Sequence, residues 1–259
     1  MTDLLAPLVV LAEEWLVIFI LIFVRIGAVV GLAPAFGEVV VPARVRLGAA
    51  FAVALLVAPA IDPSAVPSVV TPDRFVALLL TEAAIGLGIG LAVRLVVHAL
   101  QYAGSIAGQS TALTQIAGIN LAPDPMPAIG NALMIAGLAL AMVLGLHIKL
   151  VAAVIGSYET LGFGAALPGS DVALWGVSQA AAAAALGFTL AAPFLIAALL
   201  YNIALGAINR AMPQLMVAFV GAPAITGGTL VLFFLAGPLM LSVWHDRLDA
   251  ALEAPFDPR

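Results

Sequence analysis

The chain has 259 residues, of which 64% are hydrophobic and only 9% are charged, and its formal net charge is −5. Its mean hydropathy of +1.21 is far above that of a soluble domain, so the composition indicates an integral membrane protein. The absence of cysteine excludes disulfides and thiolate metal sites, and the absence of a basic tract argues against nucleic acid as a partner.

Apolar segments recur along the whole chain, each long enough, or nearly so, to cross ~30 Å of hydrocarbon. They are approximately Trp15–Leu32, Val45–Ala60, Phe75–Leu100, Ile129–Ile155, Val172–Leu205 and Thr229–Val243. Separators rich in proline and glycine divide them. The sequence therefore predicts an all-α integral membrane protein with about six helical segments, some of them broken, forming one domain over residues 1–259.

Ionisable residues lie inside the first and third segments. On the third segment Glu82 precedes Arg94 by twelve residues, which places it about 120° away around a helix. Glu82 therefore needs a cation from another segment, and Arg25 of the first segment is the natural candidate. The pair is either part of a proton relay or an ion pair that fixes helix packing. No second carboxylate lies near in the sequence, which favours the intramembrane ion pair.

Pairs of glycines four residues apart occur three times: in the first apolar segment, in the third, and directly after the third. They are Gly27 and Gly31, Gly86 and Gly90, and Gly104 and Gly108. Small residues one turn apart let helix backbones approach closely in a membrane. The pattern predicts a tightly packed bundle, formed by more than one subunit.

Uncharged polar side chains follow the third segment, from Gln101 to Gln115. If the helix continues, the side chains of Gln101, Ser105 and Gln109 form a stripe along one face. An irregular segment with three prolines follows, and such a segment is tolerated at membrane depth only inside protein or beside a wet cavity. Polar stripes also serve as hydrogen bonds between helices, and this reading stays open.

The stretch after the fifth segment carries an unusual concentration of polar groups. Pro213 removes a backbone donor, so a helix running through Leu205 should stop or kink here. Arg210 has five N–H donors, and we expect it to cap backbone carbonyls that the break releases. The tail 246–259 is acidic and short, and we expect it to be a frayed end.

Sequence motifs of enzymes are absent. The chain contains no H-E-x-x-H and no G-x-S-x-G, and its three histidines are isolated from one another. We therefore predict no catalytic site, no metal site and no cofactor.

Two motifs near opposite ends of the chain resemble the FliR family of the flagellar type III export apparatus. The first reads Arg25-Ile-Gly-Ala-Val-Val-Gly-Leu-Ala-Pro34-Ala-Phe-Gly, followed by Val41-Pro42-Ala-Arg44-Val-Arg46-Leu-Gly. The second reads Asn209-Arg210-x-x-Pro213-Gln214, followed by Val217-x-x-x-Gly221-x-Pro223. Because they occur in the same order as in the family, the resemblance covers nearly the whole chain.

The resemblance implies a structural subunit of the export gate in the bacterial inner membrane, at the flagellar basal body. Its segments would form hairpins in a helical assembly with FliP and FliQ, with FlhB associated, and unfolded flagellar proteins would pass through the channel. The segment Ser110–Pro127 would plug that channel. The residues implicated in the plug and the channel lining are Gln101, Ser105, Gln109, Ser110, Thr114, Gln115, Asn120, Pro123, Pro125 and Pro127.

Two other functions are compatible with the sequence. The related export subunit of an injectisome would have the same motifs. A secondary transporter would use helices broken by glycine and proline to form a substrate site near the bilayer midplane, and Pro193 and the Pro213–Pro223 break are the candidate positions. Inverted halves should then contain matching breaks, and the sequence shows none.

Overall fold

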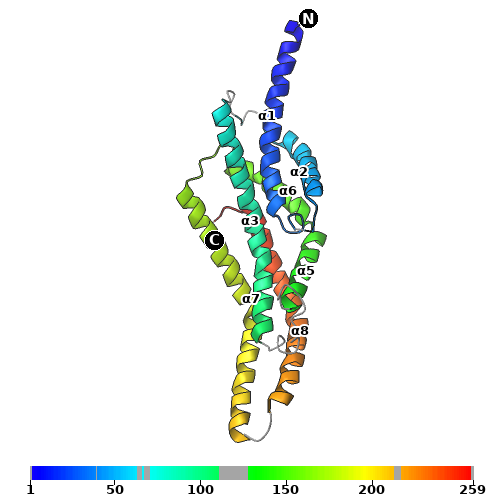
Figure 1. The fold of residues 1–259 in the computed structure, drawn as a ribbon, viewed down its shortest axis with the longest axis vertical. Coiled ribbons are helices and arrows are strands. Elements are labelled where there is room, and N and C mark those ends of the chain that lie inside the picture. The colour runs from blue at the N-terminus through cyan, green and yellow to red at the C-terminus, as the bar shows by residue number, and fades with distance from the viewer. Residues whose placement is uncertain are drawn as a thin grey trace. The chain divides into compact units, whose positions relative to one another are not determined.

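The computed structural model of the chain describes residues 2–38, 40–62, 66, 71–110, 128–212 and 217–257 (Figure 1). Within these residues every regular element is a helix. The helices are α1 (Thr2–Leu32), α2 (Ala43–Val57), the short 3-10 helix η1 (Ala58–Ala60), α3 (Pro72–Ser110), α5 (Ala128–Val143), α6 (Leu146–Thr160), α7 (Gly169–Ala211) and α8 (Val217–Glu253).

Five of these helices contain stretches long and apolar enough to cross a membrane, and a sixth crossing results if α5 and α6 are counted as one broken span. The predicted fold class, an all-α membrane protein with about six segments, is confirmed. Helix α7 continues through Pro193, so this proline, one of the two breaks that a secondary transporter could use, does not interrupt the helix. Its end at Ala211 agrees with the stop predicted before Pro213.

The fourth predicted segment, 129–155, is one of the broken segments. It is divided into α5 and α6 at Leu144-Gly145, where Gly145 adopts φ +83°. Helical residues have negative φ, and glycine reaches the left-handed region at little cost because it has no Cβ. Apolar residues continue on both sides of the break, so hydropathy alone does not reveal it.

The described chain divides into two compact units. Unit 1 comprises Met1–Arg94, Leu144–Ser178 and Asp249–Arg259, and unit 2 comprises Leu95–Val143 and Gln179–Leu248. Helices α3, α7 and α8 contribute residues to both units.

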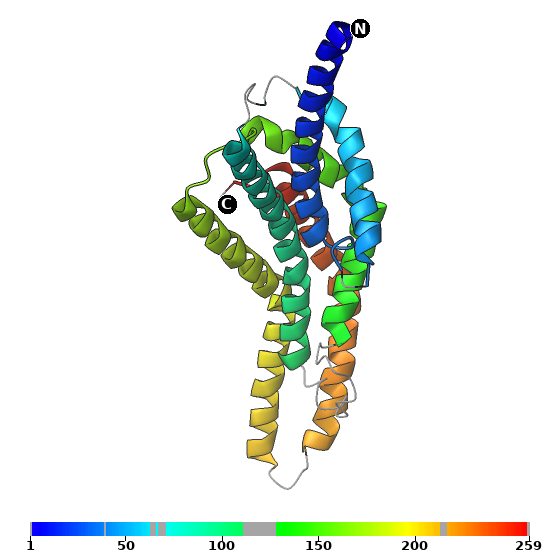
Figure 2. The ribbon, with the colours of Figure 1, turned by 45° about the horizontal axis from the view of Figure 1, so that its top comes forward.

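In unit 1, α1 packs beside α2, as Figures 1 and 2 both show. Phe19 and Phe23 of α1 meet Phe51 of α2 edge to face, with ring centroids 5.4 and 6.2 Å away. After α1 the chain turns through Pro34, and Arg94 Nη1 of α3 donates a hydrogen bond of 3.3 Å to the Leu32 carbonyl. An arginine therefore caps the C-terminal end of α1, where backbone carbonyls lack helical partners.

In unit 2, the later part of α7 and the earlier part of α8 run antiparallel (Figure 2). Trp244 of α8 is fully buried, and its indole Nε1 donates to the Val96 carbonyl of α3 at 2.8 Å. Gly104 of α3 lies against Gly130 of α5 so closely that a Cβ on Gly104 would overlap the backbone there. This contact agrees with the predicted role of the Gly104 pair.

Large apolar side chains remain exposed along the parts of α7 and α8 that belong to unit 2. They are Phe188, Leu199, Leu200 and Ile203 of α7, and Leu230, Phe234, Leu235 and Leu239 of α8. Soluble monomers rarely leave so much apolar surface uncovered. These faces fit a hydrocarbon or protein environment.

The C-terminal tail is not a frayed end, so that expectation was wrong. Helix α8 continues to Glu253, and the residues after it pack within unit 1. The Trp175 indole donates to the Pro255 carbonyl at 3.0 Å, and the Trp175 ring lies 5.8 Å from the Phe256 ring. Only two residues of the tail, Pro255 and Phe256, make these contacts. The acidic residues dominate the charge of the tail, so its composition does not reveal the packing.

Candidate functional site: a buried arginine that joins three helices

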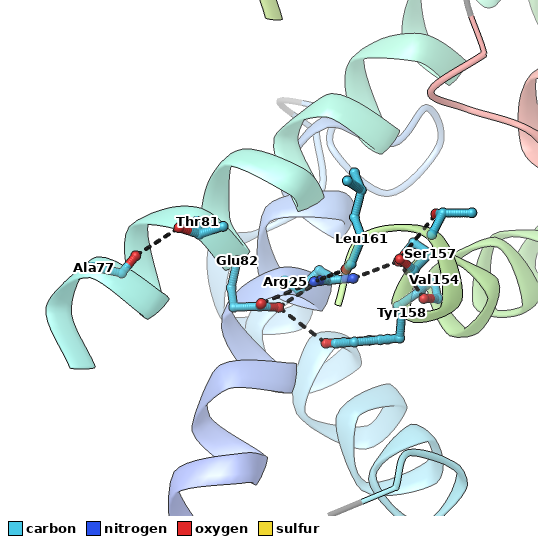
Figure 3. Close-up of polar contacts among 9 residues, drawn as sticks. Arg25, Ala77, Thr81, Glu82, Val154, Ser157, Tyr158 and Leu161 are labelled. Carbon is cyan, nitrogen blue, oxygen red and sulfur yellow. Dashed lines mark hydrogen bonds and ion pairs between the residues drawn. The ribbon is translucent and has the colours of Figure 1, made fainter. Parts of the chain in front are cut away.

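Arg25 of α1 and Glu82 of α3 are brought together in the interior of unit 1, and both are fully buried. Arg25 Nε donates to Glu82 Oε2 at 2.7 Å, and Arg25 Nη2 donates to Glu82 Oε1 at 3.0 Å (Figure 3). This two-point geometry matches the flat guanidinium to the carboxylate, and lysine lacks the planar fork to reproduce it.

Helix α6 completes the site. Arg25 Nη1 donates to the Ser157 hydroxyl at 2.9 Å, and Nη2 also donates to the Leu161 carbonyl at 3.0 Å. The Tyr158 ring lies 3.7 Å below the guanidinium carbon, and its hydroxyl donates to Glu82 Oε2 at 3.4 Å. We call Arg25, Glu82, Ser157, Tyr158 and Leu161 the Arg25 cluster. Figure 3 shows the guanidinium between Glu82 and Ser157.

The sequence locally favours this arrangement because glycines bring α1 and α3 together next to Glu82. A Cβ on Gly86, one turn after Glu82, would overlap the Arg25 carbonyl and Ala28. A Cβ on Gly90, one turn further, would press against Leu32. The close contact predicted for small residues therefore holds for this pair.

The arrangement of the Arg25 cluster suits packing rather than chemistry. Arg25 uses its donors in four hydrogen bonds, and its charge is matched by the single carboxylate of Glu82. Three helices are thereby held to one side chain. In the part of the chain that the structure describes, no three His, Asp or Glu side chains gather in a way that would hold a metal ion.

Sequence reasoning paired Arg25 with Glu82 but missed Ser157, Tyr158 and Leu161. The available signal was the polar run at 156–160, which ends an otherwise apolar segment. Lys149 of the same segment instead pairs with Asp249 of α8, at 2.6 and 2.7 Å to the two carboxylate oxygens.

The other residues of the N-terminal motif lie on the connection between α1 and α2. Pro34 is buried in the turn after α1, next to Ala35, which adopts φ 69°. Pro42 is the N-cap residue of α2, and Arg44 and Arg46 follow in its first turn. The structure brings Arg25 to Glu82 but does not bring Arg44 or Arg46 to either of them.

The residues of the C-terminal motif are only partly described. Asn209 and Arg210 are exposed in the last turn of α7, and Gly221 and Pro223 lie in the first turns of α8. Pro213 and Gln214 lie outside the described residues. The proposed cap by Arg210 concerns carbonyls next to that stretch and stays a prediction.

The polar stripe lies on the last turns of α3, which continues as a helix to Ser110. The Gln101 amide contacts the His98 ring and Met134 of α5, while Gln109 is exposed. Ser105 is half-buried. The remaining residues of the predicted plug, namely Thr114, Gln115, Asn120, Pro123, Pro125 and Pro127, lie outside the described residues.

Comparison with known proteins agrees with the two motifs. Residues 16–251 match the family described as bacterial export proteins, family 1. The chain is 34% identical over 236 residues to the flagellar biosynthetic protein FliR of Caulobacter vibrioides, covering 90% of this chain and 93% of that protein. It is 30% identical over 221 residues to the protein of that name from Escherichia coli, covering 83% of each. Together with the apolar helices, these matches show that the chain belongs to the FliR family of bacterial export proteins.

Proposed function

We propose that this chain is a structural, non-enzymatic subunit of the flagellar protein export apparatus in a bacterial inner membrane. The observation that carries the proposal is the family match over residues 16–251, on a chain whose helices are long and apolar enough to span a membrane. Its relatives from Caulobacter vibrioides, Escherichia coli and Bacillus subtilis are all named for flagellar biosynthesis, which supports a flagellar rather than an injectisome role.

The finer proposal is that the chain lines part of the export channel, together with FliP and FliQ and with FlhB associated. An unfolded polypeptide of any sequence has to pass through the channel. Fixed charges on the channel wall would therefore retain oppositely charged stretches of that polypeptide. The end of α3 supports this role, because Gln101, Ser105 and Gln109 present amides and a hydroxyl without a formal charge. The exposed apolar faces of α7 and α8 would be covered by lipid and partner subunits.

Deletion of the gene in its host tests the proposed function. We expect the deleted cells to lose swimming and to stop releasing flagellar proteins into the medium, and a plasmid copy to restore both. Continued release of flagellar proteins by the deleted cells would refute the proposal. Loss of a different set of secreted proteins, with swimming intact, would identify the injectisome alternative.

We further propose that Ser110–Pro127 plugs the resting channel. An open pore would dissipate the membrane potential, which is worth ~2.3 kcal/mol per charge for each 100 mV. The sequence of this segment contains three prolines, which would restrict its backbone, and Gly118, which would serve as its hinge. Deleting 114–120 should leave assembly intact but raise the ion conductance of the reconstituted complex above that of the wild type. Equal conductance would mean that the gate lies elsewhere.

Arg210 is expected to fix the angle at which the chain leaves α7. Arg210→Ala would leave carbonyls of the following break unpaired, at a cost of about 1–3 kcal/mol for each buried acceptor. Arg210→Lys should rescue only in part, because the donors of an ammonium group all lie on one nitrogen, whereas the planar guanidinium can reach separate acceptors from several nitrogens. The measurement is the yield of partner subunits that co-purify with the chain. An unchanged yield with alanine would contradict the capping role.

A further inference from the structure

An open groove lies within unit 1, between α6 and the C-terminal end of the chain. Its volume is about 790 Å³, and every residue that lines it belongs to α6, to the last turns of α8 or to the residues after α8. Most of the lining is small or apolar, and it includes Ala152, Ala153, Gly156, Leu252, Pro255 and Phe256. We call this feature the C-terminal groove.

The charged side chains of the C-terminal groove are predominantly acidic. Glu159, Glu253, Asp249 and Asp257 line it, against the single cation Lys149. Lys149 contacts both carboxylate oxygens of Asp249, so its charge is already matched. Glu159 and Glu253 are exposed, and neither side chain bonds to another side chain or backbone group among the described residues. The groove thus combines an apolar lining with an uncompensated negative charge.

The apolar lining and the negative charge of the C-terminal groove together indicate which kind of ligand it can bind. An anionic phospholipid headgroup would be repelled by Glu159 and Glu253. A metal ion would need three or more ligating side chains, and no such group exists among the described residues. A polypeptide segment with basic side chains on both sides of a small apolar residue matches the lining and the charge together. Complementary charge of this kind directs partner choice and association rate more than affinity.

We propose that the C-terminal groove is a docking site for a cationic segment of a partner protein. The segment would place a small apolar side chain against Gly156 and Ala153, while its Arg or Lys side chains pair with Glu159 and Glu253. This site is separate from the polar stripe of α3 and does not depend on the export role. The groove adjoins the Arg25 cluster, because Ser157 belongs to both.

Gly156 allows the groove to be filled without a change in the fold. A Cβ added at Gly156 would meet no atom within 4 Å, so a side chain there would extend into open space. Gly156→Leu would occupy the volume proposed for the partner, and Gly156→Ala is the matched control with the smallest side chain. Both replacements favour the helix, because glycine is the poorest helix former after proline.

The test uses the full chain in detergent and a fluorescently labelled peptide of alternating lysine and alanine. Binding is measured by fluorescence anisotropy, and a glutamate–alanine peptide is the charge-reversed control. We expect the wild type to bind only the lysine peptide. Gly156→Leu should weaken that binding by at least about tenfold through steric exclusion, whereas Gly156→Ala should bind within about twofold of the wild type.

The acidic side chains are tested by the double variant Glu159→Gln, Glu253→Gln. Removing two exposed charge pairs should weaken binding by about two- to thirtyfold and reduce its dependence on salt. Asp171→Asn is the control, because Asp171 is an exposed acid of unit 1 that does not line the groove. The proposal is overturned if the wild type does not bind, if Gly156→Leu binds as well as the wild type, or if Asp171→Asn weakens binding as much as the double variant.

Discussion

Glu82→Ala is expected to destabilise the protein by about 3–5 kcal/mol, because it leaves the charge of Arg25 buried without a counter-ion. Arg25 has no exposed surface, and the partners that would remain, the Ser157 hydroxyl and the Leu161 carbonyl, are neutral. Arg25→Met should cost a comparable amount by leaving the carboxylate of Glu82 unpaired. The measurement is the free energy of unfolding in detergent, obtained from denaturant titration of the purified chain.

The double variant Arg25→Met, Glu82→Leu tests whether Arg25 and Glu82 interact or whether each contributes to stability independently. Replacing both members of a buried pair with apolar groups is often nearly neutral, so the double variant should be more stable than either single variant. Lys149→Ala is the matched control, because the side chains of Lys149 and Asp249 are 36% and 33% exposed. Loss of that pair should cost at most about 1 kcal/mol. A double variant that loses the sum of both single effects would show that Arg25 and Glu82 do not interact.

Gly86→Ala should produce the second large effect, by forcing α1 and α3 apart. The added methyl group would overlap the backbone carbonyl of Arg25, which cannot rotate away as a flexible side chain can. Overpacking of this kind costs about 1–3 kcal/mol, and alanine regains about 1 kcal/mol over glycine in a helix, so we expect a net loss of up to about 2 kcal/mol. The same displacement would strain the contact between Arg25 and Glu82, one turn away.

Gly27→Ala is the matched control for this prediction. Gly27 belongs to the same type of glycine pair, but a Cβ there meets no described atom within 4 Å. The control variant should therefore be as stable as the wild type or up to about 1 kcal/mol more stable in detergent. If Gly86→Ala and Gly27→Ala shift the unfolding transition by the same amount, the close approach of α1 and α3 does not limit stability.

The charged residues of the first and third segments could be paired from the sequence because an unpaired charge in a membrane is expensive. Few ionisable side chains occur inside the apolar segments, so few cations were candidates for the partner of Glu82. Ser157 and Tyr158 carry no charge, and a hydroxyl near the end of a segment has many possible partners. The carbonyl of Leu161 has no sequence signal at all. These three contacts depend on where α6 lies in unit 1.

The two glycine pairs Gly27–Gly31 and Gly86–Gly90 also show that a local sequence pattern does not identify the neighbouring helix. Both have the same spacing, yet a Cβ added at Gly86 or Gly90 would press against α1, whereas a Cβ added at Gly27 or Gly31 would meet no described atom within 4 Å. The spacing shows that one face of a helix carries small residues. Whether a neighbour occupies that face depends on residues far away in the chain.

The sequence by itself determined the membrane class, the approximate positions of the apolar segments, the end of α7 before Pro213 and the family motifs. These properties depend on transfer of short stretches into lipid and on local backbone geometry, which neighbouring residues control. Only the tertiary structure decided that the tail packs against Trp175, that α6 completes the Arg25 cluster and that the C-terminal groove exists. The helices of this chain are apolar on nearly every face, so hydropathy cannot show which faces pack against each other. Side-chain shape and a few polar contacts determine which faces pack together.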